Sequence, residues 1–349
     1  MQGIGIGAAL GRAPGGAAPK AEARLAAFDA DLSWLSESDG FAFRARGDDA
    51  APSHHDDASA AQADGAPGWE AALPAPSAVA ALHAVEGPAA VAASFLAGSA
   101  EAASTLLTTY TSGKGGLGVF SAFNIEIVFQ GTWTAELQQD FILAAEYISS
   151  LVTGDVRNRG GIDDIRINAT LSDIDGEGGV LGQAGPTGIR LGSFIPFRGT
   201  MEFDIADSED FDAQGLFDDI VIHEMLHCLG FGTVWDLMGL TTGSIRGDNL
   251  RFDGLNAEVA MMHNFPDLYW SDPNRKLGVP VETDGGPGTA GGHWDEELFG
   301  GELMTGYIDD DNYVSAMTVG ALEDMGYATI FEKWFPTLPV PQPDDLLAA

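Results

Sequence analysis

The chain has little cysteine, few basic residues and no long hydrophobic run. Its 349 residues include a single cysteine, Cys228, which excludes an intrachain disulfide. Sixteen lysines and arginines stand against 52 aspartates and glutamates, so the formal net charge is −36. A surface of this charge repels nucleic acids and anionic membranes, and we expect neither as a partner. No apolar run reaches the roughly 18 residues that a membrane-spanning helix needs, so we expect no membrane span.

The N-terminus lacks the pattern of a conventional signal peptide. Residues 1–12 contain neither a basic first segment nor a continuous apolar second one. The acidic charge fits an exported protein or a protein from a salty habitat. The acidic and apolar tail at residues 343–349 is compatible with a C-terminal export signal. We therefore predict an extracellular, secreted protein that does not use a conventional signal peptide.

Composition divides the chain into three parts. Residues 1–117 are rich in Ala, Gly, Pro, Asp and Ser and have little periodicity, which predicts a low-complexity, mostly disordered leader or a pro-segment that covers the active site. Hydrophobic periodicity begins near residue 120, and residues 118–335 are predicted to form the folded domain. Residues 336–349 are predicted to be a flexible acidic tail. A chain that starts near Lys114 is therefore expected to fold.

The periodicity of the folded part predicts a sheet packed against helices. In three segments apolar residues alternate with polar ones, which predicts strands at 123–129, 165–171 and 201–205. In a fourth segment apolar residues recur at helical spacing, which predicts a helix at 137–152. The glycine-rich stretch 173–192 is predicted to be a loop. The strand at 201–205 is expected either to be an ordinary sheet strand or to lie at an edge, where it could pair with an extended peptide.

The most informative motif is the segment His223-Glu224-Met225-Leu226-His227, which has the pattern H-E-x-x-H. On a helix, residues four apart lie on the same face, so both imidazoles can reach one metal ion. Apolar residues precede the motif, which predicts that one side of this helix is buried. Buried histidines and a buried glutamate need partners, and a metal supplies them. The motif therefore predicts a zinc site with Glu224 as general base, the arrangement of zinc peptidases.

A catalytic zinc takes three protein ligands, so the sequence should contain a third one. The histidines upstream of the motif fall in the low-complexity N-terminal part. Downstream, the candidates are His293, His263 and the carboxylate of Glu258. Cys228 follows His227 directly and points away from it on a helix, so it is predicted to be a small buried hydrophobic residue rather than a ligand.

The surroundings of His293 distinguish it from the other candidates. The chain there reads Gly291-Gly-His-Trp-Asp-Glu-Glu-Leu-Phe-Gly-Gly-Glu-Leu-Met-Thr-Gly306, and a helix-like segment at 315–326 follows. Together with the motif at 223–227, this part of the chain resembles the leishmanolysin family of metzincin zinc peptidases. It is most similar to the shorter bacterial members, because it lacks the many cysteines of the larger enzymes. The resemblance spans residues 118–330.

The resemblance carries expectations about both site and fold. It implies that His223, His227 and His293 bind Zn²⁺, that Glu224 is the general base and that Met304 lies in a turn beneath the metal. It also implies the α+β fold of a metzincin-type domain, with a twisted sheet, an active-site helix and a C-terminal subdomain of helices and loops.

These features predict a secreted zinc-dependent endopeptidase that acts on protein or peptide substrates. The alternative is a non-catalytic secreted binding or adhesion module that retains a structural zinc. The glutamate of the motif argues against this alternative, because a structural site needs no general base. A second cation is a further possibility: the acidic residues near the third strand either hold Ca²⁺ through oxygen ligands or are simply solvated, and they are Asp204, Asp207, Asp210 and Asp212.

Overall fold

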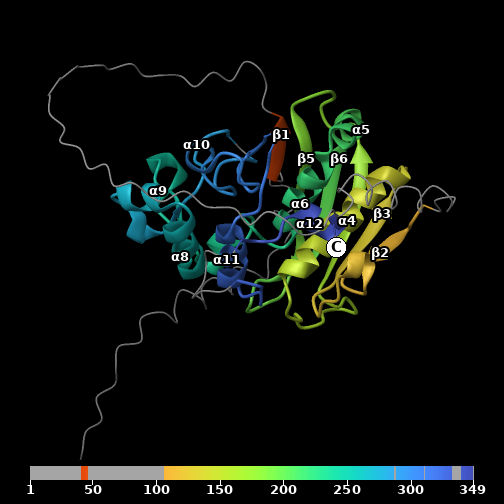
Figure 1. Ribbon diagram of the computed structural model, residues 1–349, viewed down its shortest axis with the longest axis horizontal. Coiled ribbons are helices and arrows are strands. Elements are labelled where there is room, and N and C mark those ends of the chain that lie inside the picture. Colours follow the sequence, from red (N-terminus) through yellow and green to blue (C-terminus); the bar gives the residue numbers. More distant parts are fainter. Residues whose placement is uncertain (1–40, 46–105, 287, 310, 332–338, 349) are drawn as a thin grey trace, which may run out of the picture.

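The computed structural model describes residues 41–45, 106–286, 288–309, 311–331 and 339–348. Its main feature is a seven-stranded mixed sheet in the order β10-β1-β5-β6-β4-β3-β2 (Figure 1). The strands are β1 (Phe41–Ala45), β2 (Thr109–Thr111), β3 (Ile125–Gln130), β4 (Ile165–Ser172), β5 (Val180–Ile189), β6 (Pro196–Asp204) and β10 (Tyr307–Ile308).

The centre of the sheet is parallel and is flanked by antiparallel pairs, and the outermost pair, β1 with β10, is parallel again. Strands β3, β4 and β6 run parallel, whereas β5 runs antiparallel to β6 and β2 antiparallel to β3. A parallel pair needs a crossover, and α4 (Ala135–Leu151) supplies it between β3 and β4. The helix begins at Thr134, whose hydroxyl accepts a hydrogen bond from the Leu137 N–H.

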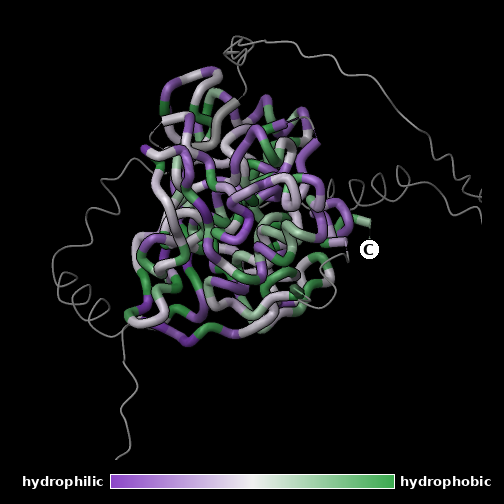
Figure 2. The backbone as a smooth tube through the Cα atoms, turned by 90° about the vertical axis from the view of Figure 1, so that its left-hand side faces the viewer, coloured by the Kyte–Doolittle hydropathy of each residue, from purple (hydrophilic) through white to green (hydrophobic). Residues whose placement is uncertain are grey.

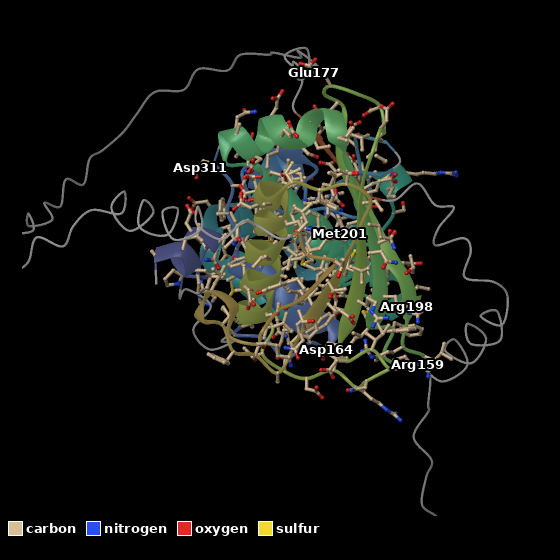
Figure 3. The ribbon with its side chains drawn as sticks, turned by 90° about the vertical axis from the view of Figure 1, so that its right-hand side faces the viewer. Arg159, Asp164, Glu177, Arg198, Met201 and Asp311 are labelled. Carbon is tan, nitrogen blue, oxygen red and sulfur yellow. The ribbon has the colours of Figure 1, made fainter. Side chains whose placement is uncertain are left out.

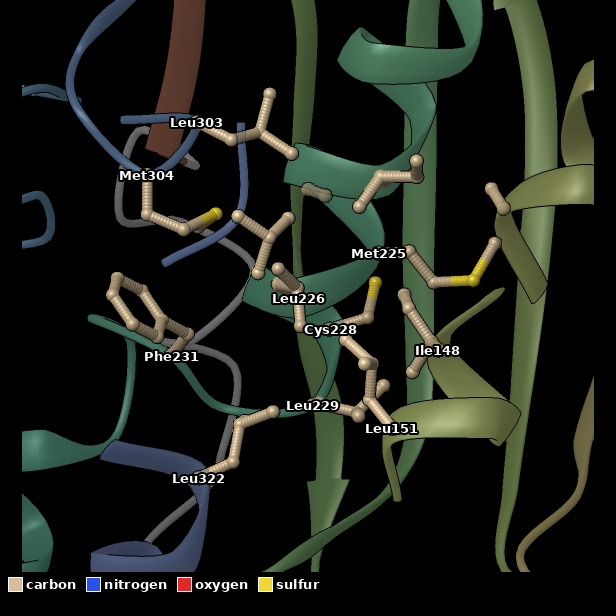
Figure 4. Packing of buried hydrophobic residues seen from close by; sticks show 14 of the residues in the cluster. Ile148, Leu151, Met225, Leu226, Cys228, Leu229, Phe231, Leu303, Met304 and Leu322 are labelled. Carbon is tan, nitrogen blue, oxygen red and sulfur yellow. The ribbon is translucent and has the colours of Figure 1, made fainter. Parts of the chain in front are cut away.

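Helix α6 (Phe217–Cys228) packs against α4 and against strands β5 and β6. Figure 4 shows Ile148 and Leu151 of α4 turned toward Met225 and Leu229 of α6. All four side chains are fully buried. Burying a side chain of this size stabilises the fold by about 1.5–3 kcal/mol, so this contact holds α6 firmly against α4.

The C-terminal part consists of short helices and a three-stranded sheet. Helix α11 packs on α8, and α12 packs on α4. Besides α4 and α6, the α-helices that the structure describes are α5 (Ile205–Gln214), α7 (Trp235–Met238), α8 (Leu255–Asn264), α9 (Pro266–Ser271), α10 (Glu296–Phe299), α11 (Ala316–Met325) and α12 (Pro343–Ala348). The small sheet contains β7 (Thr241–Thr242), β8 (Arg251–Phe252) and β9 (Val279–Pro280), and the 3-10 helices are η1 (Gly116–Gly118), η2 (Ile245–Gly247) and η3 (Arg275–Leu277). The predicted mixed α+β class is confirmed.

One prediction about the sheet is wrong. The stretch predicted as the loop 173–192 contains β5, whose three glycines and one proline conceal its strand character. Of the two alternatives for the strand at 201–205, the structure has the ordinary sheet strand: β6 pairs with β4 on one side and β5 on the other, so it is not an edge. The acidic residues that follow it form helix α5.

The sheet also begins earlier in the chain than predicted. Strand β2 pairs with β3. Ser112, which follows β2, is buried, and its hydroxyl shares a hydrogen bond with the hydroxyl of Ser149. The predicted boundary between residues 117 and 118 therefore falls after β2, and a chain that starts at Lys114 would lose this strand. Strand β1 lies still further upstream. The rest of the predicted leader, residues 1–40 and 46–105, lies outside the described residues.

Charged side chains lie at both ends of the sheet. Figure 3 shows Arg159, Asp164 and Arg198 at one end, and Glu177 and Asp311 toward the opposite end. Along the tube in Figure 2, hydrophilic and hydrophobic residues alternate at short intervals. Within the part of the chain that the structure describes, no helix has the length and apolar character needed to cross a membrane.

Candidate metal centre

The two histidines of the motif lie on helix α6, where the sequence places them on one face. Asp218 and Asp219 occupy the first turn of this helix. The helix stops before Gly230, whose φ of 107° is accessible to glycine at little cost. A Cβ at this glycine would lie 2.7 Å from the Val234 side chain, so the turn also needs the small residue for space. The chain then reverses beneath the helix.

Three buried imidazoles meet at one point. The Nε2 atoms of His223 and His227 are 2.9 Å apart, and the Nε2 atom of His293 lies 3.1 Å from the first and 3.0 Å from the second. All three side chains are fully buried. His293 comes from the loop before α10, some 66 residues beyond His227 in the chain. The fold therefore brings together the three histidines that were predicted to be ligands.

The other nitrogen of each ring faces a backbone carbonyl. His223 Nδ1 lies 2.8 Å from the Leu303 oxygen, His227 Nδ1 lies 2.9 Å from the Phe231 oxygen, and His293 Nδ1 lies 2.8 Å from the Thr289 oxygen. A carbonyl oxygen only accepts, so Nδ1 carries the proton in each ring. The Nε2 atom of a neutral ring is then the nitrogen with the lone pair. Three lone pairs that converge in this way repel one another, and a cation between them removes the repulsion.

The same surroundings keep the rings neutral. Burial lowers the pKa of His293 to about 4, and it lowers the pKa of His223 and His227 well below the usual value, with the neighbouring imidazoles adding to the effect. Neutral imidazole is the form that binds metal. The spacing also suits zinc, because Zn–N bonds of about 2.0–2.1 Å in a tetrahedral site place the nitrogens about 3.3 Å apart. The residues present therefore fit a zinc ion.

Glu224 occupies the face of α6 that looks toward the sheet. It is fully buried, and a Cβ built on Gly182 of β5 would lie 3.2 Å from its Cγ. Cys228 lies one helical turn further along the same face, and its thiol donates to the Thr200 carbonyl at 3.3 Å. Burial raises the pKa of this thiol, and the nearby Glu224 raises it further. Cys228 is thus the inert buried residue that the sequence predicted.

A turn that contacts His223 helps to hold the imidazoles in place. Met304 is fully buried in this turn, and Figure 4 shows its side chain above Phe231 and next to Leu303. The backbone N–H of Trp294, the residue after His293, donates to the Met304 carbonyl. The Leu303 carbonyl is the acceptor for His223, so one turn positions two of the three rings.

Glu302 anchors this turn, a role that sequence analysis did not assign. Its fully buried carboxylate accepts hydrogen bonds from the hydroxyls of Ser315 and Thr318 and from the N–H groups of Ser315 and Met304. Burial raises its pKa, and these hydrogen bonds oppose that rise. The turn is thereby fastened to the start of α11. The only sequence signal for this contact was the acidic residue directly before Leu303 and Met304.

The other candidate ligands lie apart from the centre. His263 is exposed on α8, and Glu258 on the same helix accepts a hydrogen bond from the Tyr269 hydroxyl. Among the described residues, one further group of carboxylates could hold a metal, and it comprises Asp155, Asp163 and Asp164, two of which are exposed.

The acidic residues considered for calcium do not gather into such a group. Asp204 caps α5 and accepts hydrogen bonds from the N–H groups of Ala206, Ile174, Asp175 and Gly176. Asp207 accepts from the Gly178 N–H. The structure therefore gives no support to calcium here, because both carboxylates hold the loop before β5.

Comparison with known proteins agrees with this geometry. The model of the leishmanolysin peptidase family matches residues 195–333, which include α6, His293, the Met304 turn and α11. None of the curated proteins compared with the chain matches it. The buried histidine trio lies within the matched residues. Over residues 195–333 the chain is therefore similar to the leishmanolysin peptidases.

Proposed function

We propose that the chain is a zinc-dependent endopeptidase in which His223, His227 and His293 hold the metal and Glu224 is the general base. The observation that carries this proposal is the convergence of the three Nε2 atoms within 3.1 Å, with the buried Glu224 next in sequence to His223 on the same helix. A structural zinc site is closed by a fourth protein ligand, whereas three ligands leave a position for water or substrate. Among the described residues, the group around these nitrogens comprises three side chains.

The chain's own residues would perform the following roles. Zinc, when bound, polarises the scissile carbonyl and acidifies the attacking water. The Glu224 carboxylate takes the proton of that water as it attacks the carbonyl carbon, and then delivers the proton to the nitrogen of the leaving amine. The buried position of Glu224 excludes bulk water from this transfer, and the carbonyls of Leu303, Phe231 and Thr289 keep the three rings oriented.

Substitution of the base tests the assignment. Glu224→Gln keeps the size of the side chain but cannot take a proton, so hydrolysis of casein should fall about 100- to 10,000-fold while bound zinc stays near one per chain. Glu209→Gln, an exposed change on α5, is the matched control and should hydrolyse casein at the unsubstituted rate. Casein hydrolysis that survives in Glu224→Gln would rule out this residue as the base.

Removal of the metal tests the dependence on zinc. A strong chelator should abolish casein hydrolysis, and added Zn²⁺ should restore it. A chain that holds zinc but never hydrolyses protein would instead support a non-catalytic binding module. We further propose that the enzyme acts outside the cell, which the excess of acidic over basic residues supports. Its detection in the culture medium of intact producing cells would test this location.

A further inference from the structure

Strand β1 comes from far outside the peptidase segment, yet it lies next to the candidate metal centre. It pairs antiparallel with β5 over residues 180–184, and it pairs parallel with β10 through Arg44 and Ala45. It also packs against α6, the helix that carries two of the three imidazoles. Figure 1 shows it as the red strand between β5 and the C-terminal part of the chain.

Both neighbours of β1 belong to the site. On one side, Phe43 is paired with Gly182 of β5. Gly182 lies close to Glu224: a Cβ built on this glycine would be 3.2 Å from the Glu224 Cγ. On the other side, β10 follows directly after the turn that contains Leu303 and Met304. The backbone of β1 therefore bridges the strand beside the base and the segment beyond the turn that holds the rings. Figure 4 shows the end of β1, in brown, next to Leu303 and Met304 in this view.

An extended peptide needs this same position. Without β1, strand β5 is the edge of the sheet, and its outer N–H and C=O groups form a template for an added strand. A peptide that added there would lie one strand spacing, about 4.8 Å, from β5 and would cross α6 as β1 does. Two chains cannot use one edge, so β1 and such a peptide exclude each other.

We propose that residues 41–45 are an internal plug that occupies the peptide-binding edge of β5 and keeps the enzyme latent. This inference rests on the proposed peptidase function. The plug is connected to the rest of the chain through residues 46–105, so its pairing is intramolecular. It therefore competes with substrate at an effective concentration on the order of a millimolar or lower. Substrate would bind with the polarity of β1, antiparallel to β5 and parallel to β10.

The first test weakens the plug in the full-length chain. Successive N–H groups of a strand point to opposite sides, so Ala42→Pro/Phe43→Pro removes the donor toward β5 whichever of the two residues supplies it. In a Glu224→Ala background, a fluorescently labelled extended peptide, for example a casein fragment, should bind at least about tenfold more tightly after this change. Ala42→Val/Phe43→Val keeps both donors and should bind the peptide as weakly as the parent chain. Equal binding by the proline and valine variants would overturn the proposal.

The second test locks the plug and so covers the case in which the proline variant does not fold. Ala42 and Gln183 are paired residues, and directly paired Cα atoms lie about 4.5–5.5 Å apart, within the range of a disulfide. Cys228 is buried and does not compete for this bond. Oxidised Ala42→Cys/Gln183→Cys should not bind the labelled peptide, and reduction by a phosphine should restore binding. Binding that is the same in both redox states would contradict the plug.

Hydrolysis by the same variants separates this inference from the proposed function. With Glu224 intact, the proline variant should hydrolyse casein at least about tenfold faster than the parent chain. A variant that binds the peptide more tightly but hydrolyses nothing would refute the peptidase function and leave the plug standing. A parent chain that is already fully active, and whose peptide binding is unaffected by the lock, would refute the plug and leave the peptidase standing.

Discussion

At the scale of single residues, the function rests on which nitrogen of each imidazole carries a proton. The carbonyls of Leu303, Phe231 and Thr289 fix that proton on Nδ1, and burial keeps the rings neutral. Two of these three rings could be assigned from the spacing of the motif alone. The third required the resemblance around His293, because 66 residues separate it from His227 and no local periodicity spans such a distance.

Replacement of the third ring tests its role directly. His293→Ala removes one of three nitrogens, and zinc affinity should fall by more than about 100-fold, since changes to residues that only support ligands already cost about 10- to 100-fold. His263→Ala removes an exposed imidazole on α8 and should leave zinc affinity unchanged. Competition with a metal-binding dye measures both. If His263→Ala weakened zinc binding and His293→Ala did not, the assigned ligand set would be wrong.

At the scale of elements, the turn that carries Met304 depends on its connection to α11. Glu302→Ala would leave the hydroxyls of Ser315 and Thr318 and the Met304 N–H buried without their acceptor. Each such loss costs about 1–3 kcal/mol, so the free energy of unfolding in urea should fall by about 3 kcal/mol or more. Zinc affinity should fall as well, because the turn also positions His223. Glu297→Ala, an exposed change on α10, should stay within about 0.5 kcal/mol of the parent. Unchanged zinc affinity in Glu302→Ala would show that the turn does not position the ring.

The elements also show why part of the fold escaped prediction. The strands β3 and β4 and the helix α4 follow clean alternation or helical spacing, and their prediction is confirmed. Strand β5 was missed because its pattern is broken by Gly182, which the crowded contact with Phe203 and Glu224 requires. Strand β1 was missed because five residues within a low-complexity stretch carry no periodic signal, and only long-range pairing reveals them. The residues that shape the proposed peptide edge are thus those that depart from local rules.

At the scale of the whole molecule, the acidic composition brings carboxylates from helices α4, α5, α6 and α12 within reach of one another. Burial, together with repulsion from Asp212 and Asp218, raises the pKa of Asp140 to about 8. Burial also raises the pKa of Asp219 to about 7, to which Asp218 contributes by repulsion, and that of Asp218 to about 6. This region is therefore a place where the acidic composition costs stability at neutral pH.

The pH dependence of stability follows from these raised pKa values. Because the folded-state pKa of Asp140 lies above its unfolded value near 4, its contribution to stability is complete below about pH 4 and is lost as pH rises toward 8. Asp140→Asn, which cannot ionise, should raise the free energy of unfolding by about 1–3 kcal/mol at pH 8 and by little at pH 4, a range that allows for partial exposure of the group. Asp267→Asn, an exposed change on α9, is the control and should have a small effect at both values. Urea denaturation at the two pH values measures the difference.

Added salt should shrink the gain at pH 8, because it screens the repulsion from Asp212 and Asp218. A gain that is equal at pH 4 and pH 8 would mean that Asp140 does not take up a proton on folding, and that the acidic interface between these helices is not the source of the pH dependence.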